Sequence, residues 1–476
     1  MRKNIASLLL AATFGAWHTA SHAQDQPTPA DPYPLAAAGW GPEAGGGLWY
    51  SRWVEDWSAM RAAGSAPSLK ALPLGGRASL TFSTETRLRY DAGQINLGDD
   101  YEQSLLRSVL GADLRLNRGL RLYAELGSGY AGGLREASTP HFENKESLQQ
   151  LFVEARTTVR GSLVGAMIGR QEFTDGPRQL VSLSDGPNLH RTWNGARLYL
   201  HRERFRLGAF DLRATRLGRG GFDEDIDRFE RLAGVNASLV VATDVDGHNT
   251  YLEPFWIHSR MPVRDAQTVA GADKRDTFGA RLWGQRGNWK LDVTLARQTG
   301  RLLGRDVEAW GFFATQSLAL SDAAWKPRLT TRIDVATGDR AGSATHERFN
   351  PLYPSSNYLG EGRLLGLGNL LLIAPGFSVS PAASTSVSVE YGFARRLVRQ
   401  DAVYAGGMRA YAGTRIGSGH DIGGLARLTG SWTGSMAGNN KVTLAGGYEY
   451  LSAGKELHRA RLASGSYGHL SVTFRY

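Results

Sequence analysis

Apolar and polar side chains alternate along residues 79–90. Read at period two, this stretch has one apolar face and one polar, mostly basic face: Leu80, Phe82, Thr84, Thr86, Leu88 and Tyr90 against Ser79, Thr81, Ser83, Glu85, Arg87 and Arg89. This period predicts a β-strand. In a soluble sandwich the apolar face would meet a core, whereas in an outer-membrane barrel it would meet lipid and the polar face would line a lumen. The strand by itself leaves both interpretations open.

The same alternation recurs to the end of the chain, over residues 108–126, 151–160, 328–335, 387–393 and 470–476. Asn117 to Gly119 supplies a tight turn within the first of these segments, and the last one ends on the aromatic Tyr476. A terminal aromatic residue after such alternation is typical of outer-membrane barrels, in which the assembly machinery reads the last strand. At about 10 residues per strand plus turns, residues 75–476 predict an all-β fold, a transmembrane antiparallel β-barrel of roughly 16 to 18 strands. Such a barrel is wide enough for a water-filled channel.

Composition agrees with a barrel and with export. Hydrophobic residues make up 42% of the chain and cysteine is absent, and the mean hydropathy is -0.31. These values exclude a bundle of apolar helices but suit strands in which every second residue is polar. Residues 1–23 have the charged start, short apolar core and Ser21-His22-Ala23 end of a signal peptide.

Residues 24–74 are expected to form a periplasmic N-terminal segment ahead of the barrel at 75–476. Trp49, Trp53, Trp57 and Met60 fall at helical spacing, which predicts a short amphipathic helix that packs against the barrel or its rim.

Most of the basic residues are arginine, which accounts for 47 of the 55. The net charge is +10. Arginine offers a planar fork to carboxylates, so it suits the recognition of anions. Alternation places a set of arginines on the inward face: Arg87, Arg89, Arg107, Arg115, Arg121, Arg156, Arg160, Arg197 and Arg332. The acidic residues interspersed with them include Glu85, Glu125 and Glu154. They either neutralise arginines across strands or prevent a polyanion from binding too tightly to leave.

Longer polar stretches predict external loops at Gly132 to Ser147, Gly218 to Arg231, Arg260 to Asp276, Gly338 to Asn369 and around Gly417 to Asp421. Asp223, Asp225 and Asp227 alternate as in a calcium loop, but Arg228 stands where the turn glycine should be. We therefore expect a solvated acidic loop there and no metal or other cofactor. No phosphate-binding loop, zinc-spaced histidine pair or nucleophile elbow is present in the sequence, so no enzyme activity is predicted.

Five groups of residues resemble the alginate-export family of outer-membrane proteins. They are Arg52 to Trp57; Leu72 to Gly75 with Thr86 to Asp91; Gly169 to Phe173; the three stretches Arg178 to Ser182, Asp185 to Asn188 and Asn194 to Leu198; and Phe349 to Pro354 with Asn369-Leu370. The resemblance runs from about Trp49 to the end of the chain. It implies a wide monomeric barrel in the outer membrane, gated by loops, with an arginine constriction that passes polyuronate. Residues that match the family's substrate contacts are Arg87, Arg89, Arg170 and Arg197; periodicity alone does not place Arg170.

The leading hypothesis is thus a channel that exports an anionic polysaccharide such as an alginate-like polyuronate. Its partners would be that acidic sugar, outer-membrane lipid and the barrel-assembly machinery, with no nucleic acid. A passive pore has no direction of its own, so uptake of acidic oligosaccharides or other small anions stays open. An outer-membrane enzyme and a soluble all-β protein are the alternatives from other classes.

Overall fold

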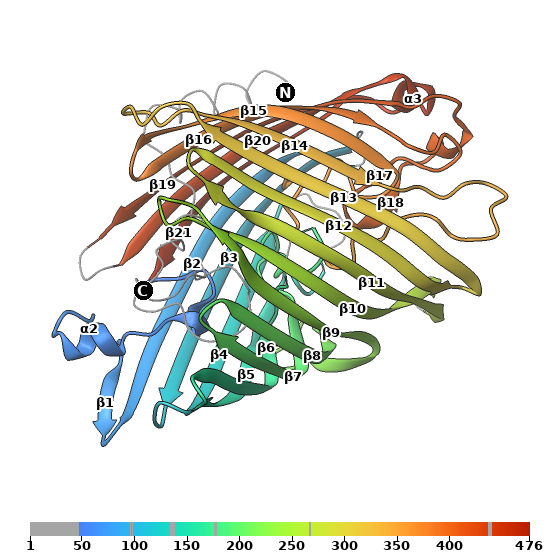
Figure 1. The fold of residues 1–476 in the computed structure, drawn as a ribbon. Helices are drawn as coiled ribbons and strands as arrows, with labels where there is room; N and C mark the ends of the chain where they lie inside the picture. The colour runs from blue at the N-terminus through green and yellow to red at the C-terminus, as the bar shows by residue number, and fades with distance from the viewer. Residues whose placement is uncertain are drawn as a thin grey trace.

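In a computed structural model the chain forms a β-barrel (Figure 1). The structure describes residues 47–95, 97, 99–133, 139–175, 179–265, 268–436 and 440–476, so the predicted signal peptide lies outside the described residues. The barrel strands are β2 (Ala78–Ile95), β3 (Asp99–Arg115), β4 (Leu120–Gly132), β5 (Asn144–Val159), β6 (Ser162–Glu172), β7 (Thr192–Arg202), β8 (Phe205–Arg216), β9 (Asp225–Thr243), β10 (Asn249–Asp265), β11 (Thr268–Arg286), β12 (Trp289–Leu302), β13 (Arg305–Ala319), β14 (Arg328–Ala336), β15 (Leu370–Ala382), β16 (Thr385–Arg395), β19 (Asp421–Ser435), β20 (Lys441–Ala453) and β21 (Gly465–Arg475).

These eighteen strands of the described part of the chain form one closed antiparallel sheet, because β21 pairs with β2. Closure satisfies every strand edge, which a lipid environment requires. The predicted strand faces are confirmed in β2, where Leu88 and Tyr90 are exposed on the outside and Glu85, Arg87 and Arg89 are buried on the inside. The prediction of roughly 16 to 18 strands is therefore correct.

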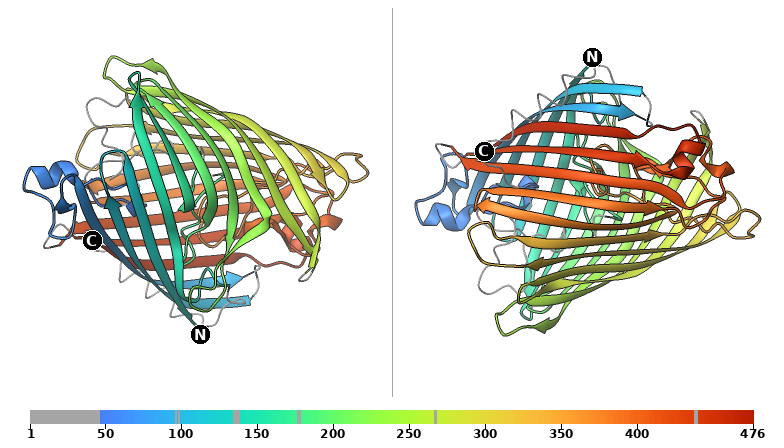
Figure 2. Two further views of the ribbon diagram at one scale, coloured as in Figure 1. Left: turned by 90° about the horizontal axis from the view of Figure 1, so that it is seen from below. Right: turned by 90° about the horizontal axis from the view of Figure 1, so that it is seen from above.

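The two ends of the barrel differ in the length of their connections. Short turns join the strands at the end where the C-terminus lies, next to α2 (Ser58–Ala62) and β1 (Leu72–Gly75) (Figure 1). Long connections, which hold β17 (Tyr404–Ala405), η2 (Gly406–Met408), β18 (Arg409–Ala410), η3 (Thr414–Ile416) and α3 (Lys455–Arg459), lie at the other end (Figure 2). Outer-membrane barrels have short periplasmic turns and longer extracellular loops, so the end with the C-terminus is periplasmic.

The structure corrects two predictions, one about a turn and one about a loop. Arg160 was expected on the inward face, but it is exposed in the β5–β6 turn, where Arg160 and Gly161 have φ values of 49° and 76°. A two-residue hairpin turn of this kind needs positive φ at both central positions, which ends the strand alternation. The long loop expected at Arg260 to Asp276 is also wrong, because β10 and β11 continue to pair there, from Arg260 with Lys274 to Asp265 with Thr268.

In residues 47–75, the described part of the N-terminal segment, the short helix predicted through Trp49, Trp53, Trp57 and Met60 is not continuous. Instead, η1 (Arg52–Val54) and α2 are separate short helices, and β1 pairs with the start of β2. Trp53 and Trp57 are both buried, as the packing prediction requires, but they lie in different clusters. No helix in the described ranges is long and apolar enough to cross a membrane.

Two extracellular connections pack against each other. Residues 173–191 join β6 to β7, and residues 337–369 join β14 to β15. The Ser182 backbone N–H donates to the Tyr353 carbonyl at 2.9 Å, and Tyr353 N–H donates to the Leu180 carbonyl at 2.8 Å. Because Leu180, Phe349 and Tyr353 belong to one buried cluster with wall residues such as Trp193, the apolar core lies inside the barrel, between the loops and the wall.

Candidate functional site

Two inward arginines, paired across β2 and β3, hold the β6–β7 connection. Arg87 and Arg107 are opposite each other in the ladder, and both are buried. Arg87 donates to the carbonyls of Asp185 and Pro187, at 2.7 Å each, and to the Gly186 carbonyl at 3.1 Å. Arg107 Nη1 donates to Asp185 Oδ1 at 2.7 Å. Loop oxygens therefore occupy both arms of the Arg87 fork and one arm of the Arg107 fork.

His190 connects this loop to the barrel wall. Its Nδ1 lies 2.5 Å from Glu172 Oε1, and its Nε2 lies 3.0 Å from Asp185 Oδ1. Burial opposes a charge on His190, but hydrogen bonds to Asp185 and Glu172 outweigh it and raise its pKa. Burial also opposes charge on Asp185, yet the guanidiniums of Arg107 and Arg87 hold its pKa well below the usual range. The loop is thus fastened by a charged carboxylate.

Arg89 holds the other inward connection. It donates to Asp91 Oδ1 at 2.6 Å, to Glu361 Oε2 at 3.2 Å and to the Tyr467 hydroxyl at 2.6 Å. Glu361 belongs to the β14–β15 connection, and although burial acts against it, Arg89 lowers its pKa. Arg87 and Arg89 therefore each bind one of the two loops that meet in the barrel. We call Arg87, Arg89, Arg107, Asp185, His190 and Glu361 the constriction cluster.

The three predicted acidic residues are buried and paired. Glu85 accepts from Arg52 at 3.1 Å, from Arg475 at 2.7 Å and from Arg107. Glu125 accepts from Arg52 Nε at 2.9 Å and from the Tyr123 hydroxyl at 2.8 Å. Glu154 accepts from Arg121 at 3.2 Å and from the Tyr199 hydroxyl at 2.5 Å. Neutralisation of neighbouring arginines, one of the two predicted roles, is therefore what these contacts provide.

Arg115, Arg121 and Arg156 lie near the periplasmic rim. Arg115 and Arg121 pair across the β3–β4 hairpin next to its turn, and both donate to Asp113, at 3.0 and 2.7 Å. Arg156 donates to the carbonyl of Arg118 in that turn at 3.1 Å. These arginines are thus well separated from the constriction cluster along the barrel.

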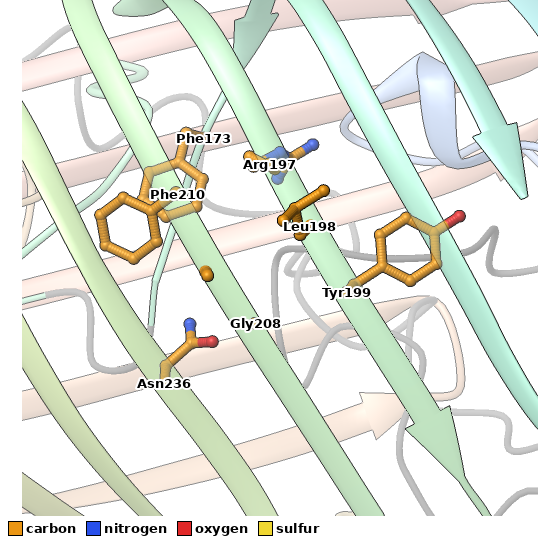
Figure 3. A pocket seen from close by; sticks show the side chains of 8 residues that line it. Phe173, Arg197, Leu198, Tyr199, Gly208, Phe210 and Asn236 are labelled. Carbon is orange, nitrogen blue, oxygen red and sulfur yellow. The ribbon is translucent and has the colours of Figure 1, made fainter.

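Arg197 is buried on β7 among aromatic rings. Its guanidinium carbon lies 5.3 Å from the Trp53 ring centroid and 5.4 Å from that of Phe173. Figure 3 shows it beside the paired rings of Phe173 and Phe210. The adjoining cavity has a volume of about 10 Å³, which is room for one water molecule and too little for a sugar.

Arg332 lies on a different arc of the wall. It donates to the Tyr358 carbonyl at 2.5 Å and stands 4.0 Å from Glu390 Oε2, whose other oxygen accepts from Arg427 at 2.7 Å. The Arg332 and Arg427 side chains, at 17% and 12%, retain more solvent exposure than the three arginines of the constriction cluster, at 2% to 6%.

Arg170 does not join the inward set, which corrects the expectation from the family resemblance. It pairs across the sheet with Leu151 and Asn194, and Leu151 is exposed on the outer face. Directly opposed residues share a face, so Arg170 faces outward. It donates to the Leu148 carbonyl at 2.8 Å and pairs with Glu224 at 3.0 Å.

The three aspartates of the acidic loop serve different local contacts. Asp223 accepts from Gly220 N–H at 2.7 Å, Asp225 pairs with Arg216 at 3.0 Å, and Asp227 accepts from Phe229 N–H at 2.8 Å. In the described ranges, the acidic and histidine side chains close enough to share an ion are instead Asp244, Asp246 and His248. Both oxygens of Asp244 are already occupied by donors of its own turn and of Gly287.

A family profile described as alginate export matches residues 75–469. The chain belongs to the alginate export family. The match begins after the N-terminal segment, so the resemblance of Arg52 to Trp57 lies outside the residues matched. A search of curated proteins found no significant match.

Solved outer-membrane structures share the fold of this alginate export protein. The crystal structure of Pseudomonas aeruginosa OccK3 (OpdO) aligns with a TM-score of 0.54 at 14% identity, covering 83% of this chain and 95% of that one. OccK9 (OpdG) of the same organism gives 0.54 at 11%, covering 83% and 98%. OccK2 (OpdF), crystallised with glucuronate, gives 0.51 at 12%, covering 83% and 97%. The protein is therefore an outer-membrane channel of the alginate export family.

Sequence reasoning missed several members of the site in this alginate export protein. Arg475 shares the polar face of the last strand with Ser471 and Thr473, so its inward direction was available from that strand. Asp185 and Arg52 appeared only within the residue groups that carry the family resemblance. Their contacts depend on how connections fold into the barrel, which no local period encodes.

Proposed function

We propose that this channel passes an anionic polysaccharide, most simply an alginate-like polyuronate on export, by exchange of carboxylates along inward arginines. The observation that carries the proposal is the occupancy of Arg87 and Arg107 by Asp185 and neighbouring carbonyl oxygens. A guanidinium fork that binds a loop carboxylate has the geometry to bind a uronate carboxylate instead. Membership in the alginate export family supports the same substrate class.

The acidic residues interspersed among the arginines favour passage of a polyanion over its tight retention. Glu85 and Glu361 already neutralise arginines of the constriction cluster, so a passing polyanion would meet competing carboxylates at each step. Conduction requires binding that is weak enough to permit release. Exchange between internal and substrate carboxylates meets that requirement without any covalent chemistry.

Uptake of an acidic sugar is the second candidate. A barrel of the same fold, OccK2 (OpdF), was crystallised with glucuronate, and a passive pore conducts in both directions. Secretion of polymer by cells that carry the gene, compared with growth on uronate as carbon source, would separate the two directions.

The test is ion selectivity in planar bilayers. The purified protein should favour chloride over potassium, and the full-length double variant Arg87→Gln/Arg89→Gln should lose a large part of that preference, because two fixed positive charges leave the constriction cluster. The matched control is Arg160→Gln, which removes an exposed arginine from a turn and should leave the reversal potential unchanged. Unchanged selectivity in the double variant would exclude these two residues from the conduction path.

A further inference from the structure

Residues 48–57 form a loop that enters the barrel interior from the periplasmic side; we call it the plug loop. Its two ends are tied together, since Glu55 accepts from the Trp49 backbone N–H at 3.4 Å and from Trp57 Nε1 at 2.7 Å. The Lys70 ammonium, also buried, pairs with Glu55 at 3.0 Å. Leu48 and Trp57 pack together with Ala71 at this base. The plug loop is therefore a closed, anchored unit.

The tip of the plug loop reaches two sets of wall residues. Arg52 pairs with Glu85 at 3.1 Å and with Glu125 at 2.9 Å. The Tyr50 ring stacks on His190 of the constriction cluster, with ring centroids 5.3 Å apart and the hydroxyl 3.0 Å from Nε2. The plug loop thus contacts the extracellular connection from below.

At the rim, oxygen atoms of the plug loop accept hydrogen bonds from wall arginines, and its Trp53 ring packs against aromatic rings of the wall. Arg115 donates to Asp56 Oδ2 at 2.7 Å and to the Glu55 carbonyl at 2.8 Å, and Arg121 donates to the Trp53 carbonyl. The Trp53 indole meets Phe152 edge to face, with centroids 6.0 Å apart, and Phe152 stacks on Tyr123 at 5.4 Å.

The wall groups that the plug loop contacts are of the kinds that bind an acidic sugar. A uronate has carboxylate and hydroxyl oxygens that accept from guanidinium forks, and the C–H face of its ring packs on aromatic side chains. We propose that Arg115, Arg121, Tyr123 and Phe152 form a second uronate-binding site at the periplasmic entrance, which the plug loop occupies in this structure. The inference rests on the proposed function and extends it.

This periplasmic site is distinct from the constriction cluster. Arg115 pairs with Ser79, and Arg107 pairs with Arg87, so the two sets lie eight residues apart along β2, or about 27 Å. The plug loop also lies outside residues 75–469, which the family profile matches. A substrate arriving from the periplasm would meet the plug loop before it met the constriction cluster.

Withdrawal of the plug loop would leave both of its acidic partners hydrogen-bonded to the wall. Without Arg52, Glu85 keeps Arg107 and Arg475, and Glu125 keeps the Tyr123 hydroxyl and Gln150 Nε2. Glu85 therefore stays paired with cations, whereas Glu125 exchanges the Arg52 cation for two neutral donors. Exchange of the plug loop for a ligand thus costs one ion pair, at Glu125, and leaves both carboxylates hydrogen-bonded.

The first experiment weakens the plug loop in the full chain and measures current in planar bilayers. Arg52→Gln/Trp53→Ala should raise conductance several-fold, and a synthetic peptide of residues 47–58 added on the periplasmic side should block the increase. Asp56→Asn, at the partly exposed rim, is the milder variant and should give a smaller increase. The control is Arg77→Gln, an exposed arginine in the β1–β2 turn, with conductance as in the unmodified protein.

The second experiment tests the site under the plug loop with tetragalacturonate as probe. The Arg52→Gln/Trp53→Ala variant should be blocked at several-fold lower probe concentration than the unmodified channel, and adding Arg121→Gln should reverse that gain. Heat-dependent gel mobility checks folding of every variant. If Arg52→Gln/Trp53→Ala and Asp56→Asn both conduct like the unmodified, anion-selective channel, the plug proposal fails while the proposed function stands. A channel without anion selectivity would instead overturn the proposed function.

Discussion

Two arcs of the barrel wall both contain arginine–carboxylate ion pairs, but the pairs differ in solvent exposure. In the capped arc, β2 to β5, Glu85, Arg107 and Arg121 have side-chain exposures of 1%, 2% and 5%. In the open arc, β14 to β19, Arg427, Arg332 and Glu390 have 12%, 17% and 21%. The plug loop and the β6–β7 connection cover the capped arc.

The difference shows that an inward arginine is not by itself a conducting residue. A buried charge needs its partner, because water cannot replace it, whereas a partly hydrated charge can exchange partners at little cost. The capped arc can therefore exchange its carboxylates only together with the loops that cover it, whereas the open arc offers charge to a passing anion in the arrangement shown.

Removal of one shared carboxylate should give the largest difference in stability between the two arcs. Glu85→Gln leaves Arg52, Arg107 and Arg475 short of their common counter-ion, so unfolding free energy should fall by about 3–5 kcal/mol. Glu390→Gln in the open arc is the matched change and should cost about 1 kcal/mol or less. Denaturant titration followed by gel mobility measures both. Equal losses would mean that the two arcs do not differ energetically.

A rise in pH should loosen the capped arc alone. His190 faces Glu172, Asp185, Arg107 and Tyr50, and its pKa is raised above the ordinary value of about 6.5. Its contribution is therefore complete below the ordinary pKa and is lost as pH rises through the raised one.

The expected result is a conductance that increases about two- to fivefold at alkaline pH, which corresponds to roughly 1 kcal/mol of loop docking. His190→Gln should remove this dependence in single-channel recordings. A variant that keeps the full pH response would assign the titration to another group.

The sequence predicted strands in both arcs, but it did not predict how deeply the side chains of each arc are buried. Period two placed Arg87 and Arg107 correctly, because the face of a strand residue is a local property. Arg160 was misplaced by a turn, and Arg170 could not be placed by period because strand phase was ambiguous near Gly169. The partners Asp185 and Arg52 come from segments that fold inward over long sequence distances, and alternation carries no information about them.

The smallest effect on stability is expected in the open arc, where selectivity should still respond. Arg332→Gln removes a partly hydrated charge whose carboxylate partner lies 4.0 Å away, so unfolding free energy should change by less than about 1 kcal/mol. Its partner Glu390 keeps an ion pair with Arg427, at 2.7 Å, and the fold should persist. Chloride preference should nevertheless fall measurably, whereas Arg170→Gln, the same change on the outer face, should leave the reversal potential unaltered. If the outer variant changes selectivity as much as the inner one, the effect follows net charge, and the open arc has no special part in conduction.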